Sequence, residues 1–358
     1  MGELLQGKQT MWSQKKVKDI APLQRGFDLP ATKLQNGKHP VCYSNGIVNF
    51  HNEFKVKGPG VFTGRSGTIG NVFFVNEDFW PHNTTLWVTD FNGNDEKFVY
   101  YFYQHLDLKK YNAGTGVPTL NRNDVHDLMV SIPDDIKEQQ KIASILSTWD
   151  KAIGLKEKLI EQKKEQKKGL MQKLLTGEVR LSGFDEDFNL FKLNQILKIR
   201  HGKDQKKVEN ENGRYPILGT GGQIGRTDQF LYNKESVLIG RKGTIDRPFY
   251  MDKPFWTVDT LFYTEINDGF HPKYIYYLFT RIPWKKYNEA SGVPSLSAST
   301  IGSIRVLVPS YQIQKEIAQI LTKMDEEIVL LRQEMQLLKV QKKGLMQNLL
   351  TGKVRVNI

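Results

Sequence analysis

The chain has 358 residues, 39% hydrophobic and 25% charged, the composition of a protein that folds in water around a core. Lys and Arg outnumber Asp and Glu by 51 to 39, and the resulting formal charge of +12 favours a polyanionic partner without requiring one. The one cysteine, Cys42, excludes an internal disulfide and a cysteine-rich zinc site, and the absence of an apolar stretch for a membrane helix or a signal peptide predicts a cytoplasmic protein with no membrane partner.

The sequence contains one unit twice, which agrees with a length that suits two domains. The segment FTGRSGTIG (62–70) recurs as IGRKGTID (239–246), so that Arg241 repeats Arg65 at an offset of 176 residues. The same offset relates YNAGTGVPTL (111–120) to YNEASGVPSL (287–296). A constant offset along most of each unit predicts two copies of one fold.

At the N-terminus, three residues of ELLQGK resemble the end of a later helical segment. Leu4, Leu5 and Gly7 correspond to Leu174, Leu175 and Gly177. If the likeness is structural, the start of the chain lies beside its end, in a circular arrangement.

Each unit begins with a globular head, from about residue 12 to 134 and again from 188 to 310. Short apolar runs between Gly, Pro and Asn are typical of strands and turns. The clearest predicted strands are VFFV (72–75), TLWV (85–88), SVLIG (236–240) and TLFYT (260–264), and aromatic helices are predicted at KFVYYFYQHL (97–106) and PKYIYYLFTRI (272–282). Each head is therefore expected to be mixed α/β. In the first head, Cys42 is expected to be an ordinary, partly buried residue.

A long helix is predicted after each head, at about 136–176 and 313–351, because these segments lack proline and are rich in Gln, Lys, Glu and Leu. Apolar residues follow heptad spacing at Ile317, Leu321, Met324, Ile328, Leu331, Met335 and Leu338 in the later helix, and at Ile142, Leu146, Trp149, Ile153 and Ile160 in the earlier one, which places Lys156 on the same frame. Since neither helix can bury this stripe alone, we expect an antiparallel pair, with the heads at opposite ends and related by a pseudo-twofold axis.

The helix ends are the best-preserved part of the duplication. KKGLMQKLLTGEVR (167–180) and KKGLMQNLLTGKVR (342–355) differ at two positions, which suggests that both meet the same kind of partner. The lysines here are Lys163, Lys164, Lys167, Lys168, Lys342 and Lys343. We expect them to be solvated, with contact to an acidic partner surface as the alternative.

This order of head, helix, head and helix resembles the specificity (S) subunit of type I restriction-modification systems over essentially the whole chain. The motifs that carry the resemblance are GRSGTIG and GRKGTID, the strand exits SIPDD and LVPSY leading into QQKIASIL and QKEIAQIL, and the Gly-Leu-Met helix ends. No single motif is specific to this family, but the order of these motifs, which occurs twice in the chain, is specific to it.

The resemblance implies two target recognition domains, at 1–135 and 181–311, that each bind one half of a bipartite double-stranded DNA site, and two conserved helical regions, at 136–180 and 312–358. It implies a non-catalytic subunit that docks modification (M) methyltransferase subunits, normally two, with restriction (R) subunits joining the complex. S-adenosylmethionine, ATP and Mg²⁺ are expected on those partners, and no cofactor on this chain. The heads are more alike than is usual in this family, which suggests that the half-sites share a base or two.

Candidate DNA-binding residues lie in polar segments of the heads, among them the predicted loops at 38–45 and 214–226. Arg65 and Arg241 can fork onto guanine or hold a phosphate, and Asn45 and Gln223 can bond adenine in pairs. The full set is Arg25, Lys38, His39, Tyr43, Asn45, Arg65, Ser66, Thr68, Lys203, Arg214, Thr220, Gln223, Arg226, Arg241, Lys242 and Thr244. The competing interpretation is that the Asn and Thr residues only build turns.

Two glycine-containing motifs have structural interpretations. Gly64, Gly67 and Gly70 lack the Lys-Ser/Thr and the strand-to-helix context of nucleotide sites, so they predict a turn between strands. The GVP segments are expected to be shaped loops that pack Pro118 and Leu120, or Pro294 and Leu296, against the head, with a binding role as the alternative.

Two other classes of function compete with DNA recognition. A scaffold whose heads bind protein would show no salt-dependent affinity for DNA. A self-sufficient nuclease or methyltransferase is disfavoured, because the sequence has no Pro-Pro dipeptide for an Asp/Asn-Pro-Pro-Tyr/Phe motif and its seven histidines form no paired metal ligands. No catalytic residue and no metal site is predicted.

Overall fold

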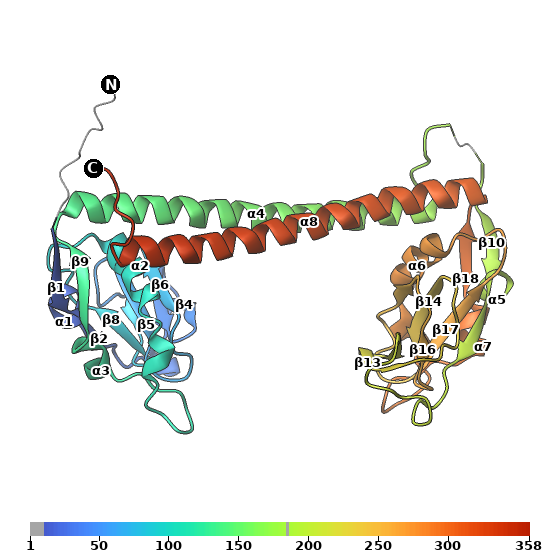
Figure 1. The fold of residues 1–358 in the computed structure, drawn as a ribbon, viewed down its shortest axis with the longest axis horizontal. Helices are drawn as coiled ribbons and strands as arrows, with labels where there is room; N and C mark the ends of the chain where they lie inside the picture. The colour runs from blue at the N-terminus through green and yellow to red at the C-terminus, as the bar shows by residue number, and fades with distance from the viewer. Residues whose placement is uncertain (1–10, 184–185) are drawn as a thin grey trace. The chain divides into compact units, whose positions relative to one another are not determined.

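The computed structural model describes residues 11–183 and 186–358, which fall into two units (Figure 1). The first comprises Met1–Glu157 with Gln333–Ile358, and the second comprises Lys158–Arg332. Both boundaries lie within the long helices α4 (Ile136–Thr176) and α8 (Tyr311–Leu350). Each unit therefore contains one head, the first half of the helix that follows it, and the second half of the other long helix.

The first head contains a four-stranded sheet in the order β2-β8-β5-β6, a three-stranded sheet in the order β4-β3-β7, and the antiparallel pair β1-β9. Its strands are β1 (Trp12–Lys16), β2 (Leu23–Arg25), β3 (His39–Tyr43), β4 (Gly46–His51), β5 (Gly60–Gly64), β6 (Val72–Val75), β7 (Trp80–Pro81), β8 (Thr85–Val88) and β9 (Met129–Pro133). Its helices are α1 (Val17–Ile20), α2 (Glu96–His105) and α3 (Arg122–His126), with 3-10 turns at Ala31–Lys33 and Leu108–Tyr111.

The second head repeats this topology, with sheets in the orders β11-β17-β14-β15 and β13-β12-β16 and the pair β10-β18. Its strands are β10 (Asn189–Lys192), β11 (Leu197–His201), β12 (Tyr215–Gly219), β13 (Gly222–Thr227), β14 (Ser236–Gly240), β15 (Phe249–Met251), β16 (Trp256–Thr257), β17 (Leu261–Ile266) and β18 (Arg305–Val308). Its helices are α5 (Leu193–Ile196), α6 (Pro272–Arg281) and α7 (Ala298–Ser303), with a 3-10 turn at Trp284–Tyr287. The predicted mixed α/β heads, their four named strands and their aromatic helices are confirmed.

The aromatic helix of each head packs against its four-stranded sheet. In the first head, Asp95 caps α2 by accepting a hydrogen bond from the Phe98 N–H at 2.8 Å, which satisfies one free donor of the first turn. Phe98, Tyr101 and Phe102 follow at helical spacing and are buried. Proline occupies the first turn of α6, where it has no hydrogen bond to lose.

The two long helices run antiparallel within each unit. In the first unit Asp150 pairs with Lys342 at 2.6 Å and Lys156 with Glu334 at 2.8 Å, so rising numbers on α4 meet falling numbers on α8. In the second unit the pairs are Lys163 with Glu327 at 2.6 Å and Lys167 with Asp325 at 2.5 Å. The antiparallel pairing is confirmed, whereas the expectation of solvated lysines is wrong for Lys163, Lys167 and Lys342, because carboxylates of the facing helix neutralise them.

One trio of polar side chains ties each head to both helices. The Tyr101 hydroxyl of α2 donates to Asp150 of α4 at 2.7 Å, and Lys342 of α8 donates to the same carboxylate at 2.6 Å while its Nζ lies 5.2 Å from the Tyr101 ring centroid. Burial and the adjacent carboxylate raise the pKa of Tyr101, so its hydroxyl remains a donor. The second unit repeats the arrangement with Tyr277, Asp325 and Lys167.

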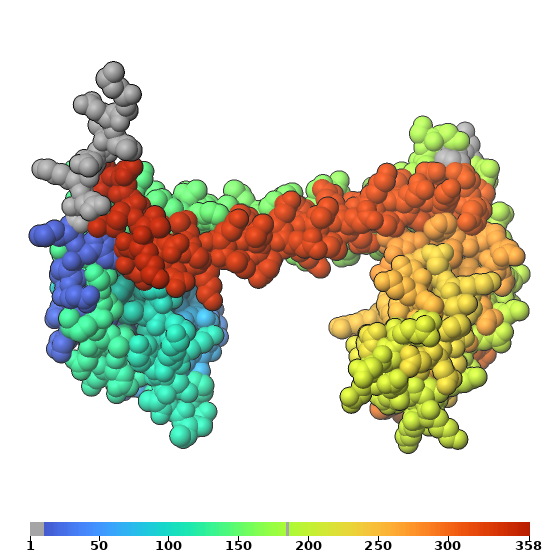
Figure 2. Space-filling view, viewed as in Figure 1, coloured from blue at the N-terminus to red at the C-terminus, as the bar shows by residue number. Residues whose placement is uncertain are grey.

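The near-identical helix ends fill equivalent places in the two heads. Leu174 and Leu175 of α4 are buried in the core of the second head, and Leu349 and Leu350 of α8 in the core of the first. Figure 2 shows the red end of α8 lying directly on the first head. The partner that both copies meet is therefore, at least in part, a head of this chain.

The C-terminal residues also contact the first strand. Arg355 donates to Glu138 at 2.7 Å, and its guanidinium lies 5.4 Å from the ring centroid of Trp12 on β1. Glu138 is only 1% exposed, so it needs this partner. These contacts place the end of the chain beside the first head, as the circular arrangement requires, although Leu4, Leu5 and Gly7 lie outside the described residues.

The heptad residues are buried to different degrees. Ile142, Leu146, Ile317 and Leu321 belong to the cores of the heads, Ile153, Ile160 and Ile328 are also buried, and Trp149, Met324, Leu331, Met335 and Leu338 are half-buried. Lys156 occupies its place on the frame with its side chain 25% exposed and its ammonium on Glu334. The heptad residues therefore pack against the heads as well as between the two helices.

The packing of α4 against the first head can be tested at Leu146, which is fully buried. Leu146→Ala is expected to lower the free energy of unfolding of the first unit by about 2–5 kcal/mol, through lost contacts and a cavity. Leu155→Ala on the same helix, where the side chain is 67% exposed, is the control and should change it by less than about 0.5 kcal/mol. Equal losses in urea unfolding of the two variants would contradict this placement.

Candidate nucleic-acid interface

Three segments meet at one end of each head. In the first head they are the turn of the β3–β4 hairpin, the glycine turn after β5, and the GVP loop at 112–120. The glycine turn favours glycine at Gly67, because its φ of +91° is a backbone conformation that other residues rarely adopt. This turn lies beside the hairpin turn, since the Cβ position of Gly67 is 3.6 Å from the Ser44 hydroxyl. The GVP loop is visible in Figure 1 as the teal-green loop after α2, on the side of the head away from the long helices.

Hydrogen bonds around Arg65 hold the segments together. The Gly67 N–H donates to the Pro118 carbonyl at 2.9 Å, and the Leu120 N–H donates to the Arg65 carbonyl at 2.8 Å. The Arg65 N–H donates to Thr84 at 2.8 Å and its Nε to the Asn83 carbonyl at 3.0 Å. The arginine is thus fixed at its backbone and at Nε, which leaves the outer guanidinium nitrogens for other contacts.

The second head repeats these bonds with its own residues. The Gly243 N–H donates to the Pro294 carbonyl at 2.8 Å, and the Leu296 N–H donates to the Arg241 carbonyl at 2.9 Å. Arg241 also lies 3.5 Å from the Asp259 carboxylate. Arg65 has no equivalent ion pair, because the residue equivalent to Asp259 is Asn83, which carries no charge. Both heads therefore present an arginine from the same framework, with different neighbours.

The GVP loops differ from the expectation at their prolines. Leu120 and Leu296 are buried as predicted, at 1% and 3% exposure. Pro118 and Pro294 are exposed, because their carbonyls are turned in to accept hydrogen bonds from the glycine turns. The prolines shape the loop and face solvent.

The segments at 38–45 and 214–226, treated as loops from the sequence, form the hairpins β3–β4 and β12–β13. Each hairpin has a β-bulge, at Val41/Cys42 and at Ile217/Leu218, which breaks the alternation that identifies strands. Cys42 is fully buried in β3, and burial raises the pKa of its thiol. The thiol is therefore held unreactive inside the sheet.

The structure places some candidates in the turns that meet at this end of each head and others further along the hairpins. Asn45, Arg65, Ser66, Thr68, Thr220, Arg241, Lys242 and Thr244 lie in the hairpin turns and glycine turns. Lys38, His39, Arg214 and Arg226 lie at the opposite end of the hairpins, as the pairings His39–His51 and Pro216–Arg226 show. Tyr43 and Gln223 are on the strands beside the turns. Arg25 is the last residue of β2, and Lys203 follows β11.

Internal contacts limit several of these candidates. Arg226 donates to the carbonyls of Gly213 at 2.6 Å and Arg214 at 3.1 Å, so it holds the base of its hairpin. Arg25 lies 3.3 Å from Asp28. The Tyr43 ring lies 4.5 Å from that of His82, whose pKa is lowered by burial.

Sequence reasoning missed cations on the 3-10 turns beside the glycine turns. Lys109 and Lys110 are exposed on Leu108–Tyr111, and Lys285 and Lys286 on Trp284–Tyr287. Lys109 packs over Gly70, where any side chain would collide with it. The signal was present as a KKYN sequence repeated at the offset of 176 residues, ahead of each GVP loop.

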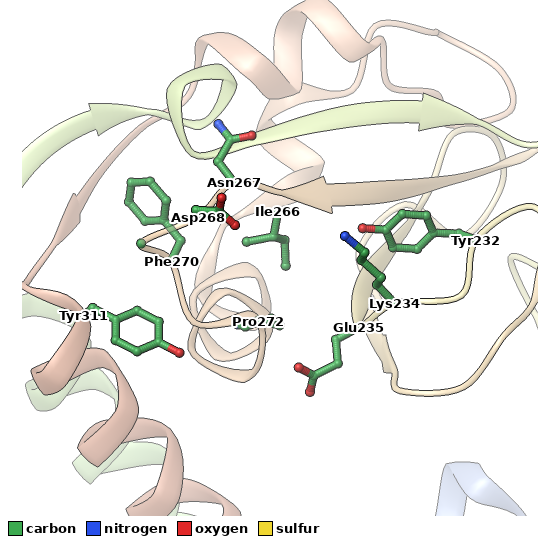
Figure 3. Close-up of a pocket in the computed structure, with 10 residues that line it drawn as sticks. Tyr232, Lys234, Glu235, Ile266, Asn267, Asp268, Phe270, Pro272 and Tyr311 are labelled. Carbon is green, nitrogen blue, oxygen red and sulfur yellow. The ribbon is translucent and has the colours of Figure 1, made fainter.

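A polar hollow of about 390 Å³ lies elsewhere in the second head (Figure 3). Figure 3 shows Tyr311, the first residue of α8, on one side and Tyr232 with Lys234 on the other. Its lining includes residues just ahead of β14, such as Glu235, whereas the glycine turn follows the other end of that strand. The hollow is therefore separate from the glycine turn. Among residues 11–183 and 186–358, no group of three His, Cys, Asp or Glu side chains able to hold a metal ion is found.

Comparison with known proteins identifies the family. The model of the type I restriction modification DNA specificity domain matches residues 10–164 and again 185–340. The chain therefore belongs to this family and carries its domain twice, as the sequence motifs indicated. In the part of the chain that the structure describes, no helix is long and apolar enough to cross a membrane.

Relatives and solved structures agree with this assignment. The type I restriction enzyme MjaVIII specificity subunit of Methanocaldococcus jannaschii is 27% identical over 307 residues, which cover 73% of this chain and 71% of that protein. The crystal structure of the type I restriction-modification S subunit from M. genitalium matches with a TM-score of 0.65 at 20% identity, covering 97% of this chain and 98% of that one. A chain from a structural study of complex assembly and conformational transition of the type I R-M system matches with a TM-score of 0.64 at 12% identity, over 99% and 100% of the two chains.

Proposed function

We propose that this chain binds double-stranded DNA as the specificity subunit of a type I restriction-modification complex, with each head recognising one half of a split site. The observation that carries the proposal is the repeated interface: both heads present an arginine from the same hydrogen-bonded framework of hairpin turn, glycine turn and GVP loop. A single surface used twice on divergent heads suits two related but different targets.

The chemistry of the two interfaces suits DNA. Arginine binds phosphate oxygens or the O6 and N7 atoms of guanine, and exposed lysines nearby supply sequence-independent attraction to phosphates. In the first head, Arg65 is the arginine, and Lys109 and Lys110 are the exposed lysines. Affinity would come mainly from the lysines and sequence preference from the turns.

The helical region is proposed to dock the partner subunits. Two modification subunits would bring S-adenosylmethionine and the methyltransferase reaction, and restriction subunits would bring ATP, Mg²⁺ and cleavage. Leu337 and Val340 of α8 are 56% and 58% exposed although they lie on a well-formed helix, which favours a protein partner on that face. The chain itself would supply recognition and assembly.

Selection from a random duplex library tests the proposal directly. The chain assembled with its modification subunits is expected to enrich one motif with two defined parts and an unread gap. A protein scaffold would enrich none and would show no salt-dependent affinity for DNA. Either of those results would refute DNA recognition.

The two arginines should affect different half-sites. Arg65→Ala is expected to weaken binding about tenfold or more through one half-site, and Arg241→Ala through the other, since each removes one forked contact. Arg200→Ala is the control, because this arginine is on β11 and its guanidinium lies 2.9 Å from Glu265. Affinity is measured on duplexes with one half-site randomised at a time, and equal losses through both half-sites for either variant would contradict one head per half-site.

The long helices are proposed to set the gap between half-sites. The helices α4 and α8 have 41 and 40 residues without interruption, a length of about 60 Å at 1.5 Å per residue. Seven residues added to both helices, after Glu157 and after Arg332, keep the heptad frame and lengthen each by about 10 Å. The gap should grow by about three base pairs while both half-site sequences stay the same.

Motif selection with this variant measures the gap. Seven residues added to α4 alone serve as the control, because the ion pairs before and after the insertion can then no longer all stay in register. This variant should lose the defined motif. An unchanged gap in the double-insertion variant would refute the role of the helices as a spacer.

A further inference from the structure

The outer strand of the interface hairpin differs between the heads in its exposed side chains. In the first head, β4 exposes Ile47, Val48 and Phe50 at 45%, 55% and 51%. The register of the two hairpins is the same, so the equivalent residues of β13 are Gln223, Ile224 and Arg226. One apolar position is therefore shared, and two change from apolar to polar.

The apolar row of β4 contributes little to the core of the first head. β4 is the edge strand of the sheet β4-β3-β7, and these side chains are outside its buried clusters. An exposed apolar edge promotes aggregation, and proteins normally protect such edges with charged or polar residues. β13 is protected in this way by Gln223 and Arg226, whereas the apolar β4 needs a partner to cover it.

The surroundings of β4 indicate which partner that is. Lys38 precedes the hairpin, and Lys55 and Lys57 follow it, all exposed, with Glu53 as the one acid between His51 and Gly58. Lys38 lies at the base of the hairpin, where His39 pairs with His51, and the glycine turn that carries Arg65 lies beside its turn. The apolar strand therefore runs from one cationic end to the other, which fits a surface that offers apolar groups between phosphates. The major groove of DNA is such a surface, because it admits a two-stranded β-ribbon and displays the C5-methyl groups of thymine.

The hairpin is also continuous with the proposed DNA interface. Its turn lies against the glycine turn that carries Arg65, where a Cβ on Gly64 would lie 3.0 Å from the Ser44 carbonyl oxygen. Residues 47 to 50 extend from this turn for about 10 Å at the rise of a strand, which corresponds to about three base pairs. A hairpin whose turn meets the DNA would bring this row to adjacent bases.

We propose that the first head reads thymine methyl groups with Ile47 and Phe50, while the second head reads its half-site by hydrogen bonds from the equivalent strand, chiefly from Gln223. The inference rests on the proposed function. Phenylalanine and aliphatic side chains favour thymine through its methyl group, and glutamine bonds adenine N6 and N7. Arg226 contributes less to base reading, since its Nε and Nη2 atoms are bound to the Gly213 and Arg214 carbonyls.

Replacing thymine by deoxyuridine tests the inference, because the two bases differ only in the methyl group. The half-site of the first head is the one that stays constant when residues 188–310 are exchanged for another head. That half-site is expected to contain at least one thymine within three adjacent base pairs. Deoxyuridine there should weaken binding of the assembled complex by about fourfold per contacted methyl group, the factor for burying one such group. Deoxyuridine in the other half-site should have no such effect.

The double variant Ile47→Gln, Phe50→Arg gives the first head the polar residues of the second. It is expected to bind thymine and deoxyuridine duplexes equally and to select a different sequence in that half-site alone. Because both side chains are exposed, the fold should tolerate the changes. Met129→Gln is the matched control, since Met129 is 57% exposed in the same head but on β9, and it should keep the full deoxyuridine effect.

Three results would overturn the inference. They are a first-head half-site without thymine, an unchanged affinity on deoxyuridine substitution, and a double variant that keeps the deoxyuridine effect. Loss of modification subunits from the double variant, together with unchanged affinity for deoxyuridine duplexes, would assign the strand to a protein contact instead. In all these cases the unaltered chain would still select a split motif, so failure of this inference is distinguishable from failure of the proposed function.

Discussion

The trio of tyrosine, aspartate and lysine that joins each head to both long helices is the constraint on which the arrangement depends. Asp150 of α4 binds Tyr101 of the head and Lys342 of α8 at once, so one carboxylate fixes the head and the register of the antiparallel helices together. The buried leucines of the helix ends then seat α8 on the first head. Because the second unit repeats these contacts, packing accounts for the buried leucines and the paired lysines that the two helix ends share.

The heads are under a weaker constraint at their outer end. Backbone hydrogen bonds fix the glycine turn and the GVP loop in both, so their shape is independent of most side chains they display. Side chains such as Asn83 and Asp259 beside the arginines, or Ile47 and Gln223 on the hairpins, are therefore free to differ between the heads. The backbone that shapes the turns is thus separate from the side chains on their surface. Such an arrangement would allow the surface side chains to change while the fold is retained.

The sequence predicted the parts of the structure that depend on local pattern and on the duplication. Strands such as VFFV at β6 and SVLIG at β14, the aromatic helices and both long helices were visible in it, as was the glycine turn. The hairpin β3–β4 was missed, because Gly, Pro and a bulge hide its alternation. The ion pairs of Lys167 and Lys342 were also missed, because their partners are far away in sequence. The exposure of Ile47 and Phe50 was beyond prediction, since an unrecognised strand has no assigned faces.

The central claim is that each head selects one half of a split DNA site. It is tested most directly by mapping methylated adenines in the DNA of host cells before and after the head at 188–310 is replaced by that of a relative. We expect one asymmetric split motif in the first case, and in the second a motif that keeps one half and the gap but has a new second half. A motif that changes in both halves, or methylation without a split motif, would contradict the account.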